Sequence, residues 1–401
     1  MKDRRDHIFV LVSAAIFMDM LVYTLVIPVL PAHAIRLGAD TVALGIIFGS
    51  FSLSLLLFSI PFGLASDRIG RQPFMVLGMI SLAATNVIFA LSGNFYVLIL
   101  ARLLQGMSGA ATWSAGLAML SETFGPEDRA PRLGAAMSVM SLGTLLGPAV
   151  GGILYDSFGY ATTFIIPSVL ACIVGIAFMS VKEQTGRETR ARLREHISPL
   201  LRTPRVFLAI ALAVVAGAAT YGILEPYMPV YLLSAFGATP TFIGLTFGAM
   251  SCMSAVTQPV VGKLYNARGA NRLISAGLAC SALVIATSVL MPSLRMTAAV
   301  FSLLGATMGF ALTPMLPLLS DLYGGNGDSN SGGLVYGIYN TLFSLGLAAG
   351  PFIGGLLIAS YTFRSTVIGY GFILVLAGLV AFAVIRVPQS VRVSIVSTQT
   401  K

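Results

Sequence analysis

The chain has 401 residues, of which 56% are hydrophobic and only 10% charged, and its formal net charge is +9. Because soluble domains carry about a quarter of charged residues, this composition excludes an ordinary soluble protein and indicates a chain immersed in lipid. The basic residues lie in short loops between apolar runs rather than on one soluble face, so we expect no nucleic-acid partner.

Twelve apolar stretches follow one another along the chain, each long enough to cross about 30 Å of hydrocarbon. They cover 8–30, 42–65, 74–92, 95–120, 133–155, 160–181, 206–234, 241–262, 272–291, 296–322, 334–359 and 363–387. The first stretch is too long for a cleavable signal and is followed by further spans, so we expect it to stay as an anchor. The predicted fold is an all-α membrane protein with 12 transmembrane helices.

The longest connection, 182–205, divides an N-terminal six-helix bundle (1–181) from a C-terminal bundle with a short tail (206–401). This connection holds seven basic residues, which would suit either a regulatory or lipid-binding site or, as we favour, a linker lying on an anionic leaflet. If the N-terminus is inside, 20 basic residues fall on the inner side and only Arg36, Arg295 and Arg364 outside. The positive-inside rule then predicts a bacterial-type inner-membrane protein with both termini cytoplasmic.

The two halves repeat one another. Pro28 and Pro31 recur 198 residues later as Pro226 and Pro229. The run Gly143-x-x-x-Gly147-Pro148-x-x-Gly151-Gly152 recurs 203 residues later, starting at Gly346. A duplication of this kind predicts a pseudo-twofold axis along the membrane normal, a solute site near the midplane between the halves, and alternating access.

The loop after the second stretch contains Gly63, Asp67, Arg68, Gly70 and Arg71. Their spacing resembles the signature motif of the major facilitator superfamily, and two further motifs resemble others of that family. In this loop we expect Gly63 to allow close helix approach, Asp67 to cap or neutralise the N-terminal end of a neighbouring helix, and Gly70 to make the turn. We expect the two arginines to keep the loop on the inner side of the membrane.

The second motif surrounds Arg102, the only basic residue well inside a stretch, where a charge costs roughly 3 kcal/mol or more. Arg102 is either a structural or proton-relay residue or a side chain that snorkels to the outer interface. The third motif is the run from Gly143 to Gly152, which resembles that of the antiporter branch. In that run Pro148 bends the helix, and generic tight packing is the alternative interpretation.

Two acids, Asp19 and Glu225, lie well inside apolar stretches, and no basic residue is obviously placed to neutralise either one. Such carboxyls indicate a cation site, a proton site or both, the alternative being a protonated acid bonded to a neighbouring helix. The run Leu224-Glu225-Pro226-x-x-Pro229 is similar to that of the vesicular amine transporters and their bacterial relatives, in which the glutamate contacts the amine. Their further acids are unmatched, because 309–314 holds none and the eleventh stretch offers Asn340 instead.

Aromatic residues could complete a cation cage around these acids. The candidates, together with Asn340, are Tyr23, Tyr221, Tyr231, Trp113, Tyr339 and Phe343. The resemblance therefore implies a monomeric, proton-coupled antiporter that exports hydrophobic organic cations, such as monoamines or multidrug substrates. We expect it to use protons as the coupling ion and no other cofactor.

Two other function classes remain open on the residues alone. A symporter of a sugar or an organic anion could use the same scaffold, although an anion site would want a basic residue at the midplane and only Arg102 is available. A receptor or enzyme is the third class, but the sequence shows no phosphate loop, metal-ligand cluster or nucleophile–base pair. We therefore expect no catalytic or metal site.

Overall fold

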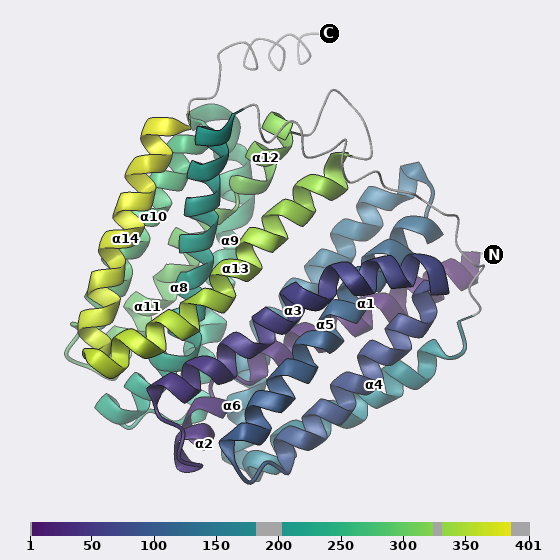
Figure 1. The fold of residues 1–401 in the computed structure, drawn as a ribbon, viewed down its shortest axis with the longest axis horizontal. Helices are drawn as coiled ribbons and strands as arrows, with labels where there is room; N and C mark the ends of the chain where they lie inside the picture. The colour runs from purple at the N-terminus through teal and green to yellow at the C-terminus, as the bar shows by residue number, and fades with distance from the viewer. Residues whose placement is uncertain (1, 182–202, 324–330, 386–401) are drawn as a thin grey trace. The chain divides into compact units, whose positions relative to one another are not determined.

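The computed structural model describes residues 2–181, 203–323 and 331–385, and helices make up nearly all of them (Figure 1). The helices are α1 (Lys2–Leu25), α2 (Leu30–Arg36), α3 (Thr41–Ile69), α4 (Arg71–Ala90), α5 (Phe95–Thr123), α6 (Pro126–Phe178), α8 (Pro204–Phe236), α9 (Pro240–Arg268), α10 (Ala270–Ser288), α11 (Leu294–Leu312), α12 (Met315–Tyr323), α13 (Ser331–Ser360) and α14 (Phe363–Val384). This confirms the all-α prediction.

Within these ranges, eleven helices are long and apolar enough to cross a membrane. One of them, α6, is two helices that meet at Gly159, whose φ of 82° and ψ of 178° are not helical. Glycine adopts positive φ without the steric penalty of a Cβ, so the chain can change direction there. Counted as two, the parts of α6 bring the spans to the twelve predicted ones.

Prolines lie at the two places where the helix breaks inside a predicted stretch. The first stretch ends as a helix at Leu25, and a turn that includes Pro28 separates α1 from α2. The stretch 296–322 is likewise divided before Pro314 into α11 and α12. Proline lacks the N–H that an uninterrupted helix needs, so apolarity alone overestimated both lengths.

The first compact unit contains residues 2–181 together with Ala219–Ser251 and Leu347–Phe363. In it α1 packs on α6, α3 on α5, and α4 on both α5 and α6. Glycines bring these helices close: a Cβ on Gly143 of α6 would lie 2.7 Å from the carbonyl oxygen of Phe17 on α1. The predicted acids Asp19 and Glu225 both belong to this unit.

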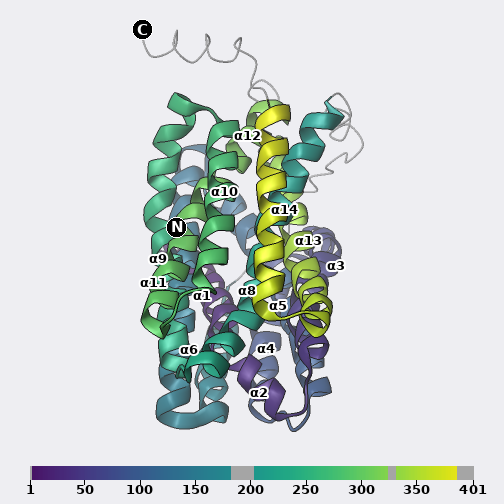
Figure 2. The same ribbon diagram turned by 90° about the vertical axis from the view of Figure 1, so that its left-hand side faces the viewer.

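The second compact unit contains the described residues of 203–218, Cys252–Gly346 and 364–385. Here α10 packs on α11, and α10 runs beside α14, where Ser275 Oγ donates to the carbonyl of Gly378 over 2.7 Å (Figure 2). The predicted linker 182–205 lies outside the described residues except for its last three positions. Its boundaries stay a prediction.

Candidate transport site

Asp19 lies on α1 and is only 2% exposed. The indole Nε1–H of Trp113 on α5 donates to its Oδ2 over 2.7 Å. Gly109, one turn earlier on α5, faces the same carboxyl, because a Cβ there would lie 3.4 Å from that oxygen. Helix α5 thus places a neutral hydrogen-bond donor beside the Asp19 carboxyl.

Glu225 lies on α8, is 9% exposed, and accepts a 2.7 Å hydrogen bond from the hydroxyl of Tyr23. Tyr23 follows Asp19 by four residues on α1, so the two side chains share one face of that helix. One turn of α1 therefore presents an acid and a tyrosine that binds the second acid. The structure brings four of the predicted site residues into two hydrogen-bonded pairs, Trp113 with Asp19 and Tyr23 with Glu225, and the two pairs meet α1 one turn apart.

Arg102 is fully inside the protein, with 1% exposure, so it does not snorkel to an interface. Its Nη1 donates to Gln105 Oε1 over 2.8 Å. Three aromatic rings surround the guanidinium carbon at centroid distances of 4.8, 5.0 and 5.7 Å, from Phe48, Phe51 and Tyr23 respectively. Cation–π contacts of this kind stabilise a desolvated arginine.

The charge of Arg102 acts on both Glu225 and Tyr23. The expectation that no basic residue lies near the acids is therefore wrong for Glu225. Sequence reasoning also missed the other members of the arginine's surroundings. Gln105 could have been found from its i+3 spacing on α5, whereas Phe48 and Phe51 come from α3 and only the fold brings them there.

The remaining predicted cage residues lie on α8 and α13. Tyr221 lies one turn before Glu225 on α8 and is half-buried. Tyr231 packs against Phe363, with 5.1 Å between ring centroids. Tyr339 and Phe343 stack on α13 at 6.0 Å, near half-buried Asn340, in the second unit. Their role as substrate contacts stays a prediction.

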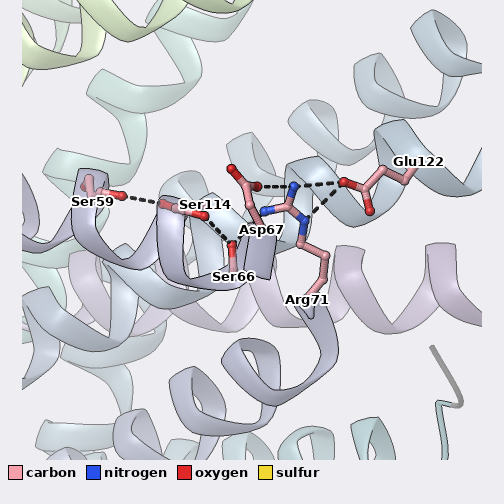
Figure 3. Close-up of polar contacts among 7 residues, drawn as sticks. Ser59, Ser66, Asp67, Arg71, Ser114 and Glu122 are labelled. Atoms are coloured by element: carbon pink, nitrogen blue, oxygen red, sulfur yellow. Dashed lines mark hydrogen bonds and ion pairs between the residues drawn. The ribbon is translucent and has the colours of Figure 1, made fainter. Parts of the chain in front are cut away.

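The signature loop forms an ion-pair cluster between α3, α4 and α5 (Figure 3). The guanidinium of Arg71 contacts Asp67 and reaches Glu122 Oε1 over 2.8 Å, while its Nη1 donates to Ser66 Oγ over 2.7 Å. Asp67 therefore pairs with Arg71, and its predicted effect on a helix N-terminus stays a prediction. Gly70 makes the expected turn, with φ of 116°, between α3 and α4.

Two other residues of the signature loop are Arg68 and Gly63. Arg68 is exposed, and its predicted effect of keeping the loop on the cytoplasmic side stays a prediction. Gly63 is not a close-approach position, because a Cβ there would lie 3.9 Å from Ser114 Cβ, an ordinary van der Waals distance.

The second half carries a different contact at the matching position. Tyr265 of α9 stands 198 residues after Asp67, and Asp321 of α12 stands 199 residues after Glu122. The Tyr265 hydroxyl donates to Asp321 Oδ2 over 2.6 Å. A single hydrogen bond thus stands where the first half has an arginine between two acids.

The Gly-Pro run of α6 packs on two sides. Gly147 and Gly151 face α1, where a Cβ would lie 2.6 Å from the carbonyl oxygen of Leu21 and 3.0 Å from Leu25 Cγ respectively. Gly152 faces α9 instead, because a Cβ there would lie 2.7 Å from the Pro240 carbonyl carbon. Pro148 carries the carbonyl that faces Gly244 of α9. These contacts favour the tight-packing interpretation of the run.

Comparison with known proteins fits this arrangement. The sequence profile of the Major Facilitator Superfamily matches residues 12–332 and 210–400, which together cover nearly the whole chain. This chain belongs to the major facilitator superfamily. As a member of a superfamily of transporters, the protein is a membrane transporter and not an enzyme.

Relatives of this major facilitator include amine and drug transporters. Human MFS-type transporter SLC18B1 is 30% identical over 376 residues, which cover 88% of this chain and 81% of that protein. Multidrug resistance protein 2 of Bacillus subtilis (strain 168) is 27% identical, covering 88% and 90% respectively. The rat chromaffin granule amine transporter is 26% identical, covering 86% and 64%. The resemblance stated from the motifs is confirmed.

Solved structures support the major facilitator fold. A bacterial homolog of the human lysosomal transporter Spinster, in an inward-facing and unoccupied conformation, matches with a TM-score of 0.84 at 14% identity, covering 96% of this chain and 97% of that one. A point mutant of the nucleoside transporter NupG matches with a TM-score of 0.79 at 11% identity, covering 94% and 100%. At these identities the likeness concerns the fold alone.

Proposed function

We propose that this transporter exports hydrophobic organic cations in exchange for protons, with both termini in the cytoplasm of a bacterial-type cell. The observation that carries the proposal is the pair of buried acids, Asp19 on α1 and Glu225, which accepts a hydrogen bond from Tyr23 one turn after Asp19 on the same face of α1. A carboxyl inside a span is costly unless it binds a cation or a proton. The names of relatives as amine and multidrug proteins support organic cations as the substrate class.

Competition for the same carboxyls is sufficient for exchange. A cation that binds a carboxylate displaces its proton, and a proton that binds releases the cation, so each ligand lowers the affinity for the other by the same factor. No further cofactor is needed, because the proton is the coupling ion. Alternating access would expose these acids to one side of the membrane at a time.

The two acids differ in their surroundings, and this predicts different roles. Asp19 accepts a hydrogen bond from a neutral indole, whereas Glu225 also lies within the field of Arg102. We expect Asp19 to carry the exchanged proton, and Glu225 to select for positive charge in the substrate. A sugar or anion symporter is the less favoured alternative, because Arg102 is enclosed by aromatic rings and Gln105.

Proteoliposomes with an imposed pH gradient test this function. In proteoliposomes with the wild-type protein, the pH gradient should drive transport of a labelled hydrophobic amine. Reversing the gradient should reverse the direction of that transport. Asp19→Asn should abolish the driven transport, and Glu225→Gln should weaken binding of cationic substrates more than of neutral analogues. Exposed Asp128 supplies the matched control, Asp128→Asn, which should transport normally.

Full gradient-driven efflux by Asp19→Asn would overturn the mechanism. Uptake of a labelled sugar in the direction of the proton gradient, with no response to amines, would favour the symporter instead.

A further inference from the structure

Tyr227 of α8, two residues beyond Glu225, is 3% exposed, and its hydroxyl reaches two other helices. The hydroxyl lies 2.9 Å from the carbonyl oxygen of Thr41 in the first turn of α3, and 3.0 Å from that of Pro351 in α13. A tyrosine has one hydrogen to donate, so the two carbonyls share it. All three helix segments belong to the first compact unit.

Glycines on both partner helices shape the slot that holds this ring. A Cβ on Gly45 of α3, or on Gly355 of α13, would lie 2.6 Å from the Tyr227 hydroxyl oxygen, closer than such atoms can approach. A Cβ on Gly354 would lie 3.2 Å from the ring itself. The three glycines thus leave the space that the Tyr227 ring and hydroxyl occupy. We call this contact of Tyr227 with α3 and α13 the Tyr227 joint.

The joint lies in the same turn of α8 as Glu225. Residues two apart on a helix point in nearly opposite directions, so Glu225 binds Tyr23 on one side while Tyr227 binds α3 and α13 on the other. Pro226 and Pro229 remove two backbone donors from this turn. Side-chain contacts therefore take a larger share in holding the turn in place.

We propose that Tyr227 is the positioning residue for Glu225. Its hydroxyl holds the Glu225 turn of α8 against the first turn of α3 and the Pro351 region of α13, and so keeps the Thr41 end of this unit closed. The proposal rests on alternating access, as proposed above, because Glu225 can be reached from the Thr41 end only when this joint releases. The bond is made to main-chain carbonyls, so Tyr227 is the only side chain whose removal tests it directly.

Spin-label distances between exposed Ile35 of α2 and exposed Ala235 of α8 test the joint. The native cysteines Cys172, Cys252 and Cys280 would be replaced by alanine, and both labelled positions by cysteine. Wild-type protein in lipid nanodiscs should show one dominant distance. Tyr227→Phe keeps the ring and loses the hydroxyl, so a longer distance should appear, with its population raised about fivefold, as loss of one net hydrogen bond allows.

The matched control is Tyr370→Phe. Tyr370 also donates to a main-chain carbonyl, that of Ala216, but away from Glu225 in the second unit. It should leave the distance distribution unchanged. Gly354→Ala, which presses on the Tyr227 ring, should act like Tyr227→Phe and serves if that variant does not fold.

A second measurement separates positioning from general stability. Tyr227→Phe should lower the apparent KM for the amine on the Thr41 side by up to about fivefold, with a smaller change in kcat, because the minor state that is open at the Thr41 end becomes about fivefold more populated. An unchanged distance distribution in both Tyr227→Phe and Gly354→Ala, or an equal change in Tyr370→Phe, would overturn the proposal. The distances need no substrate, so a failure of amine–proton exchange would be seen separately.

Discussion

Arg102 illustrates at the residue scale how a charge is held inside a span. Its guanidinium faces three rings and the side-chain carbonyl oxygen of Gln105. Lysine keeps the charge but has no planar group to stack on these rings. We expect Arg102→Lys to lower the free energy of unfolding by about 1–2 kcal/mol, measured as a fall in the thermal unfolding midpoint of the purified transporter.

Arg295, exposed at the start of α11, is the matched control. Arg295→Lys should leave the unfolding midpoint unchanged. Equal midpoints for wild type and Arg102→Lys would show that the rings do not contribute to holding the charge.

His33 on α2, outside the candidate spans, predicts a pH dependence of stability. Its ring stacks on Tyr160 at 3.5 Å, with Arg36 close to its Nδ1, and burial lowers the pKa of His33. Because the unfolded chain then binds the proton more readily, stability is full above about pH 6.5 and is lost as pH falls toward the folded pKa. His33→Phe keeps a stacked ring without a titrating group.

The unfolding midpoint of His33→Phe should therefore fall less than that of wild type between about pH 7.5 and about pH 5.5. Exposed His7, for which His7→Phe should not alter this slope, is the control. Parallel pH curves for wild type and His33→Phe would contradict the assignment.

At the scale of the helix, two glycines of α6 differ in whether close packing on a neighbouring helix requires them. A Cβ on Gly152 would lie 2.7 Å from the backbone of α9, whereas a Cβ on Gly134 meets nothing within 4 Å. Gly152→Ala must push the two helices apart, so we expect it to destabilise the protein by about 1–3 kcal/mol. Gly134→Ala should be neutral or stabilise the helix by up to about 1 kcal/mol.

Thermal unfolding of both variants in the same detergent checks this difference. Because the substitutions are chemically identical and lie on the same helix, intrinsic helix propensity cancels in the comparison. Equal midpoints would show that α6 and α9 do not need their close approach.

The elements themselves were predictable, and their partners were not. Apolar length gave all the spans, because lipid demands about twenty apolar residues per crossing, and the i+4 spacing of Asp19 and Tyr23 gave one face of α1. The sequence could not show that Trp113 binds Asp19, 94 residues away, or that Tyr23 binds Glu225, 202 residues away. Those pairs depend on how the helices pack, which hydrophobic patterning does not encode.

At the scale of the whole molecule, the two repeats share helices but not the chemistry at the ends of those helices. Arg71 pairs with Asp67 and Glu122 in the first repeat, while Tyr265 donates to Asp321 in the second. The first cluster depends on charge on both partners, and salt screens such pairs at partly exposed sites. The second depends on one hydroxyl donor, which added salt affects much less.

Salt should therefore separate two variants, Arg71→Gln and Tyr265→Phe. At low salt Arg71→Gln leaves Asp67 and Glu122 facing one another without the arginine, and its unfolding midpoint should lie well below that of wild type.

Raising the salt from about 0.1 M to about 1 M shortens the screening length from about 10 Å to about 3 Å. This weakens the wild-type ion pairs and also the repulsion between Asp67 and Glu122 in Arg71→Gln, so the difference between the two unfolding midpoints should narrow. Tyr265→Phe should lower the free energy of unfolding by about 1 kcal/mol. The difference between its unfolding midpoint and that of wild type should hardly change with salt. A salt-independent gap for Arg71→Gln, or a gap for Tyr265→Phe that narrows equally, would mean that the two repeats hold their helix ends by the same kind of interaction.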